Sequence, residues 1–147
     1  GFSAALCMYD TANHLLELEE VRQLFQNVHR ALPPGGWFLF DVNMRTAFEL
    51  NWQTSTAFVE DSYVGALRMS WDSKERLGTM RITVYRLKTG TWHRSDAVIR
   101  ERCYSTDELE GALESAGFTA VEKHYAAAAS MLGRQFFVCR KPESPLN

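Results

Sequence analysis

No Gly-x-Gly turn occurs anywhere in these 147 residues, although the chain contains nine glycines. A glycine-rich turn after a first strand allows a nucleotide-like cofactor to approach the backbone closely. The sequence therefore lacks the most specific signal for such a cofactor site.

Cysteine is also scarce. The three thiols, Cys7, Cys103 and Cys139, are widely separated and lie in apolar runs. With an odd count and no Cys-x-x-Cys or Cys/His cluster, neither a disulfide framework nor a metal site is predicted. Reduced thiols are typical of the cytoplasm, which is the location we expect.

Long hydrophobic runs and clustered positive charge are absent as well. The apolar runs are far shorter than the ~20 residues of a membrane-spanning helix. The net charge is −2, and Lys and Arg are dispersed along the chain. We therefore expect neither a membrane nor a nucleic acid as a partner. The length and the 46% hydrophobic content predict one globular unit with a core.

The most informative segment that is present runs from Arg30 to Asn43. A helix ends there, a Pro-Pro-Gly-Gly turn follows, and a short apolar run finishes in Asp41 and Asn43. This order indicates one step of a doubly wound parallel sheet, in which ligands lie just outside the carboxyl ends of the strands. The apolar run Phe2–Met8 is typical of another parallel strand, with both faces buried.

Helical and extended patterns flank this step. Apolar residues recur at helical spacing over 18–32, and a capping box of Ser105 and Glu108 begins a helix that Gly117 ends. The remaining segments predict a short helix over 44–50 and strands over 118–125 and 133–141. Between them, residues 56–103 alternate like antiparallel strands, with three strands near 63–71, 80–84 and 92–103 and hairpin links at 72–76 and 88–91.

Taken in order, these segments resemble the class I S-adenosylmethionine-dependent methyltransferases. Phe2–Met8 resembles the fourth strand of that fold, and Leu32–Asp41 resembles its Leu-x-Pro-Gly-Gly motif with the fifth strand. Residues 104–118 resemble the late helix and the sixth strand of the family, and residues 133–141 resemble its closing strand. The stretch 56–103 resembles the antiparallel insert of small-molecule N-methyltransferases of the glycine and amino-sugar type.

The resemblance implies an α/β fold: strands four to seven of a Rossmann-like methyltransferase sheet, with an antiparallel β insert. Residues 1–55 and 104–141 would form a partial core, 56–103 the insert and 142–147 a tail. The glycine-rich loop, the ribose-binding acid and the adenine-binding turn of the family all precede its fourth strand, and this sequence contains none of them. We therefore expect a homodimer or a missing N-terminal half, because one edge of Phe2–Met8 would otherwise be unpaired.

The implied activity of the intact protein is transfer of a methyl group from S-adenosylmethionine to N or O of a small-molecule acceptor. Two other interpretations stay open. One is a non-enzymatic, methyltransferase-like module for binding or assembly. The other is an unrelated ligand-binding cup built on 56–103.

The loop after the first strand supplies the candidate cofactor-binding residues Cys7, Met8 and Tyr9. The resemblance implies that the backbone of Cys7 and Met8 binds the methionine part of the cofactor and that the Tyr9 ring shapes the transfer pocket. Alternatively, Met8 and Tyr9 only pack, and Asp10 and Asn13 only shape a turn.

His14 is the candidate catalytic base, because an imidazole exchanges a proton near neutral pH; it could instead be purely structural. Asp41 and Asn43 are candidate acceptor-binding residues, or alternatively a helix cap. A last group of aromatic residues either forms a lid over the substrate or packs within the sheet: Trp52, Tyr63, Trp71 and Trp92.

Overall fold

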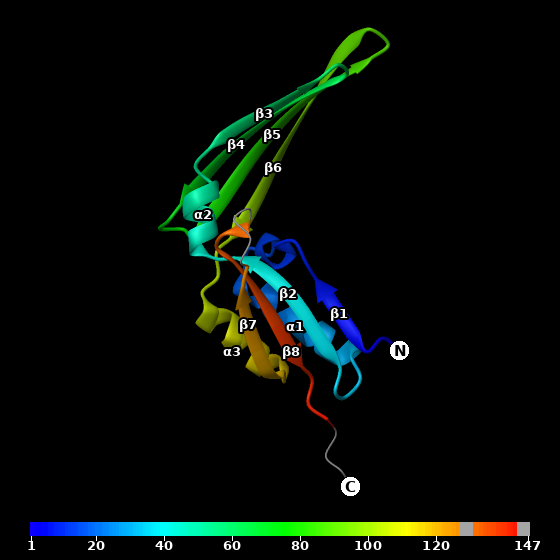
Figure 1. The fold of residues 1–147 in the computed structure, drawn as a ribbon, viewed down its shortest axis with the longest axis vertical. Helices are drawn as coiled ribbons and strands as arrows, with labels where there is room; N and C mark the ends of the chain where they lie inside the picture. The colour runs from blue at the N-terminus through cyan, green and yellow to red at the C-terminus, as the bar shows by residue number, and fades with distance from the viewer. Residues whose placement is uncertain (127–130, 144–147) are drawn as a thin grey trace.

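A computed structural model describes residues 1–126 and 131–143. The chain forms two four-stranded sheets that meet end to end (Figure 1). One sheet with its helices is called the body, and the other is called the arm. The predicted α/β class with a separate antiparallel sheet is confirmed.

The body sheet has the strand order β1-β2-β8-β7. Strand β2 pairs in parallel with β1 and antiparallel with β8, and β7 pairs antiparallel with β8. These strands are β1 (Ala4–Cys7), β2 (Trp37–Asn43), β7 (Thr119–Tyr125) and β8 (Arg134–Arg140). The parallel pair brings the carboxyl ends of β1 and β2 to one end of the sheet.

Two helices cover one face of the body sheet, namely α1 (Leu18–Ala31) and α3 (Thr106–Ala116). The apolar stripe of α1 buries Val21 and Phe25 against Phe38 and Phe40 of β2. Helix α3 begins at the predicted cap, where the Ser105 hydroxyl accepts a hydrogen bond from Glu108 N. It ends at Gly117, whose φ of 91° is the left-handed conformation that glycine tolerates.

The opposite face of the body sheet is open. Leu6 of β1 is 69% exposed and Phe2, just before it, is 86% exposed. The prediction that this segment is buried on both faces is wrong, because β1 lies at the sheet edge and α1 and α3 cover one face. The predicted unpaired outer edge is confirmed among the described residues.

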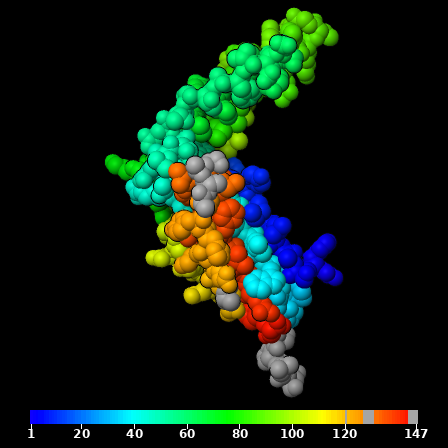
Figure 2. Space-filling view, in the orientation of Figure 1, coloured from blue at the N-terminus to red at the C-terminus, as the bar shows by residue number. Residues whose placement is uncertain are grey.

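The arm sheet is antiparallel and runs in chain order, β3-β4-β5-β6. Its strands are β3 (Ser55–Glu60), β4 (Tyr63–Asp72), β5 (Leu77–Lys88) and β6 (Thr91–Arg102). Figure 2 shows that the arm projects from the body. Three of the strands were predicted. The fourth, β3, is exposed along its whole length and therefore shows no burial alternation in its sequence.

Two short elements fill the joint between body and arm. The 3-10 helix η1 (Thr11–His14) contacts both β2 and β6. Helix α2 (Arg45–Asn51) packs on the arm, where the Phe48 ring stacks on Trp71 with centroids 4.8 Å apart. Next to α2, Met44 N donates a hydrogen bond of 2.9 Å to Gly133 O.

The predicted linker over 126–130 and the tail from Pro142 lie largely outside the described residues. Within the described part of the chain, no helix is long and apolar enough to cross a membrane.

Candidate functional site

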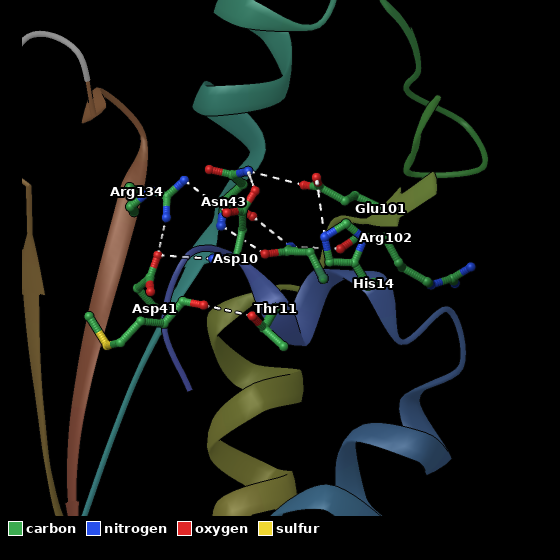
Figure 3. Close-up of polar contacts among 10 residues, drawn as sticks. Asp10, Thr11, His14, Asp41, Asn43, Glu101, Arg102 and Arg134 are labelled. Carbon is green, nitrogen blue, oxygen red and sulfur yellow. Dashed lines mark hydrogen bonds and ion pairs between the residues drawn. The ribbon is translucent and has the colours of Figure 1, made fainter. Parts of the chain in front are cut away.

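Polar side chains from five segments meet where the carboxyl ends of β1 and β2 reach the joint (Figure 3). Among those drawn are the two predicted acceptor residues and the predicted base. The group contains Asp10, Asn13, His14, Asp41, Asn43, Glu101 and Arg134. These are the residues that the topology brings together at the end of the parallel pair.

Asp41 anchors the loop that follows β1. Its carboxylate accepts hydrogen bonds from Tyr9 N at 2.6 Å and from Asp10 N at 3.2 Å. Both residues have left-handed backbone angles, with φ of 59° and 50°. Such a conformation is costly for non-glycine residues and persists only where the surroundings enforce it. Here the buried Asp41, which is 1% exposed, enforces it.

Arg134, at the start of β8, neutralises part of this acidic group. Its guanidinium pairs with Asp41 and, at 3.1 Å, with Asp10. Burial acts to lower the pKa of Arg134, but the two carboxylates outweigh it and raise that pKa. Arg134 is therefore a fixed positive charge at the site.

Asn43 links the body to the arm. Its side-chain amide donates hydrogen bonds to Asp10 Oδ2 at 2.8 Å and to Glu101 Oε2 at 3.1 Å. Helix α2 begins after Met44 without any side-chain cap. The alternative prediction of a capping role for Asn43 is therefore wrong, because its amide is used inside the site.

Glu101, near the end of β6, is 3% exposed. Burial and the charge of Asp10 raise its pKa from 4.5 to about 8. Nε2 of His14 lies 3.9 Å from Glu101 Oε1. The predicted base thus lies beside a buried carboxyl group that is mostly protonated at neutral pH.

The side chain of Asn13 forms hydrogen bonds across the joint between body and arm. Its amide nitrogen donates to Asn43 O at 3.1 Å and to Arg102 O at 2.8 Å, and its oxygen accepts from Asn43 N at 2.9 Å. One fully buried side chain therefore ties together η1, β2 and β6.

Two cavities open beside these groups. The larger, of about 280 Å³, has the polar groups of Asp10, Asn43, Glu101 and Arg134 on its walls. Its other lining residues are Asn51, Trp52, Met80, Met131 and Leu132. The smaller, of about 120 Å³, is lined by Met8, Tyr9, Asp41, Met131, Arg134 and Phe136. Arg134 and Met131 belong to both linings, so the cavities are neighbours.

The predicted cofactor residues lie at the smaller cavity or beside it. Met8 lines it together with Tyr9, whose side chain is 78% exposed. Cys7 ends β1 and is half-buried, and burial followed by the charge of Asp41 raises the pKa of its thiol. The alternative that Tyr9 only packs does not fit its exposure.

The aromatic residues proposed as a lid divide into two groups. Trp52 lines the larger cavity, and Trp71 packs on Phe48 at the base of the arm. Tyr63 pairs with Arg86, and Trp92 pairs with Leu87, at the far end of the arm. The lid prediction is wrong for these last two, because the arm carries them away from the joint.

Sequence reasoning missed two main site residues. Glu101 lies in an alternating strand, where the pattern predicts only a residue on the polar face. Arg134 lies beside an apolar run, and nothing in the local sequence marks it as functional. Asp10 was noticed only as a turn residue. The signal that could have found them is their position, since Asp10, Glu101 and Arg134 each lie within a few residues of the end of a predicted strand.

No protein-family model matches the sequence. The chain is similar to a protein of Geobacillus sp. (strain WCH70) that is named as a methyltransferase. The two are 29% identical over 150 residues, which cover 96% of this chain and 61% of the relative. The chain thus spans about three fifths of the length of that relative.

Solved methyltransferase structures have the same fold. An S-adenosylmethionine-dependent methyltransferase of Clostridium acetobutylicum ATCC 824 has a TM-score of 0.80 at 18% identity, over 96% of this chain and 58% of its own. A second neighbour is CalS10, an amino pentose methyltransferase of Micromonospora echinaspora solved with S-adenosylmethionine bound. Its TM-score is 0.72 at 18% identity, over 95% of this chain and 58% of its own. The predicted resemblance to class I S-adenosylmethionine-dependent methyltransferases is confirmed at the level of the fold.

Proposed function

We propose that, in the intact protein, this chain takes part in methyl transfer from S-adenosylmethionine to a nitrogen or oxygen of a small molecule. The observation that carries the proposal is the pair of neighbouring cavities at the carboxyl ends of the parallel strands. Ligands of doubly wound sheets bind at this edge. The similarity to CalS10 supports both the cofactor and the class of acceptor.

The smaller cavity suits the methionine end of the cofactor. Met8 and the exposed ring of Tyr9 offer an apolar wall, and the ion pair of Asp41 and Arg134 contributes to the lining. Its volume of about 120 Å³ leaves the nucleoside end to other parts of the intact protein. The cofactor supplies an electrophilic methyl group when it is bound.

The larger cavity suits the acceptor. At about 280 Å³ it is near the lower end of the ~300–1,000 Å³ range of small-molecule pockets. Its lining combines the polar groups of Asp10, Asn43 and Glu101 with the side chains of Trp52 and Met80. This combination orients a polar group on an apolar body, and much of the rate of a displacement reaction comes from such positioning. His14, beside Glu101, is proposed to take part in removing the proton of the acceptor.

The three cysteines are free thiols, which agrees with the proposed cytoplasmic location. We propose a small-molecule acceptor as the partner of this site.

The test is methyl transfer by the intact protein from methyl-¹³C-labelled S-adenosylmethionine to separate panels of small amines and alcohols, followed by NMR. We expect a labelled N-methyl or O-methyl product. Binding of the cofactor without transfer to either panel would favour the alternative, a methyltransferase-like binding module.

A further inference from the structure

Glu101 differs from the other carboxyl groups of the site in what holds it. Asp10 and Asp41 both pair with the guanidinium of Arg134. Glu101, although 3% exposed, has only the neutral amide of Asn43 as a hydrogen-bond donor among the described residues, and His14 Nε2 lies 3.9 Å from its Oε1. Burying a carboxyl group without a fixed cation is expensive, and proteins tend to retain such groups at functional sites.

The position of Glu101 is as informative as its burial. It lines the larger cavity together with Asp10 and Asn43, and Trp52 belongs to the same lining. It also lies between that cavity and His14, whose side chain is 45% exposed. Glu101 therefore adjoins both the cavity and a residue in contact with solvent (Figure 3). His14 Nε2 lies 3.9 Å from Glu101 Oε1, so one bridging water or a small rotation of the imidazole would complete a proton path.

We propose that Glu101 receives the proton of the acceptor atom and that His14 passes it to solvent. The inference rests on the proposed function and assigns the proton-accepting role to a residue of the arm. The acceptor atom loses its proton to a Glu101 carboxylate oxygen and keeps the electron pair, which then forms the bond to the methyl carbon. The proton leaves through His14, so Glu101 is ionised again for the next cycle.

The charges that face Glu101 suit this task. Burial raises the pKa of Glu101 most, followed by the charge of Asp10, which also raises it through a side-chain hydrogen bond. The Asn43 amide and the charge of Arg134, from β2 and β8, lower this pKa in part. A carboxyl group with a pKa of about 8 instead of 4.5 is a stronger base by about three orders of magnitude. At pH 7 about a tenth of the Glu101 side chains are ionised, and only this fraction acts as the base, so its share rises as the pH approaches 8.

The probe that tests this role is cyclohexylamine, compared with cyclohexanol. The amine carries a positive charge up to about pH 10, as a lysine side chain does, and the alcohol has the same ring with a neutral proton donor. Both are titrated into the 147-residue chain while the side-chain carboxyl carbons of glutamate are followed by ¹³C NMR from pH 4 to about 10.

We expect one glutamate signal that titrates near pH 8 and is missing from Glu101→Gln. Bound cyclohexylamine should lower that midpoint by about one pH unit or more, because an ammonium group stabilises the carboxylate. Glu101→Gln should weaken binding about tenfold, since a charge-assisted hydrogen bond is lost. The matched control is Glu110→Gln, which should change neither result. In the native chain Glu110 pairs with Lys123 on the surface of the body.

His14→Gln separates the two residues. The response of the Glu101 signal to the amine should persist in this variant, because Glu101 is the group in contact with the probe. Binding of cyclohexanol that depends on Glu101 would support the same role with a hydroxyl acceptor.

The proposal is wrong if neither probe binds, if both bind Glu101→Gln as tightly as the native chain, or if the response is lost in His14→Gln alone. No methyl donor is present in this experiment. Failure here is therefore distinguishable from failure of the proposed function, which the transfer assay reports.

Discussion

Asn13 connects the body to the arm through its side chain. Three hydrogen bonds connect its buried side chain to the backbone of β2 and β6. Asn13→Ala leaves buried backbone groups without partners, so we expect the free energy of unfolding to fall by about 3 kcal/mol. Urea denaturation measures it. Asn27→Ala, on the exposed surface of α1, should stay within about 0.5 kcal/mol of the native chain; an equal loss in both would refute the role of Asn13.

Glu101 should make stability depend on pH. Its pKa is about 8 in the folded chain and 4.5 as the reference for the unfolded chain, so the folded state holds one more proton between these values. Its stabilising contribution is complete below pH 4.5 and is lost as the pH rises through 8. Over this window the native chain should lose up to about 1.4 kcal/mol per pH unit relative to Glu101→Gln. Denaturation curves that run parallel for both proteins would contradict the assignment.

At this scale, sequence reasoning found the residues that stand at strand ends. The position of Asp41 and Asn43 at this edge could be predicted because they follow an apolar run after a Pro-Pro-Gly-Gly turn. Their role in binding the acceptor stays a prediction, and of the two only Asn43 lines the larger cavity. Glu101 and Arg134 could not, because their role depends on how β6 and β8 meet β2, which are contacts between segments distant in the chain. Local sequence does not encode such contacts.

At the scale of elements, the segment before β8 approaches the start of α2 closely. Gly133 has a φ of 81°, and a Cβ atom there would lie 2.2 Å from Ala47 N. Gly133→Ala combines a strained backbone with a clash against backbone atoms, so we expect a loss of about 3 kcal/mol or more.

The matched control for that variant is Gly111→Ala on α3, where a Cβ atom meets nothing within 4 Å. Alanine favours a helix over glycine by up to about 1 kcal/mol, so this substitution should stabilise the chain. Thermal unfolding of the two variants should therefore shift in opposite directions, and a shift in the same direction would show that the close approach at Gly133 is unimportant.

Elements with a local signal were predictable from the sequence. The capping box at Ser105 and the glycine that ends α3 act within a few residues and were confirmed. Strand β3 was not predicted, since it is exposed on both faces and has no burial pattern to read. The prediction for β1 was wrong for a different reason. Its apolar run indicates that the strand tends to be buried, but not which elements are present to cover each face.

At the scale of the whole molecule, cofactor binding by the isolated chain is the first question. The sequence has no Gly-x-Gly turn, and the smaller cavity holds only part of a nucleoside-bearing ligand. We expect calorimetric titration of the 147-residue chain with S-adenosylmethionine to show weak binding or none. A micromolar dissociation constant, roughly 8 kcal/mol, would mean that these residues provide a complete cofactor site.

The open edge of β1 and the open face of the body sheet predict association of the isolated chain. Phe2 and Leu6 are exposed there, and Trp37 of β2 is 40% exposed. An unpaired strand edge is a template for pairing with another chain. Sedimentation velocity at micromolar concentration should show a species larger than the monomer; a monomer that stays soluble and folded would contradict the prediction.

The most direct test of the account asks whether the larger cavity at the joint is where the acceptor is methylated. Asn51, exposed at the end of α2, lines this cavity, so Asn51→Trp should obstruct it. In the intact protein, with methyl-labelled S-adenosylmethionine, we expect kcat/KM for the acceptor to fall by about tenfold or more while cofactor affinity is unchanged. Asn27→Trp, on the outer surface of α1, should transfer methyl groups as the native protein does. Equal transfer by the native protein and Asn51→Trp would contradict the placement of the acceptor in this cavity.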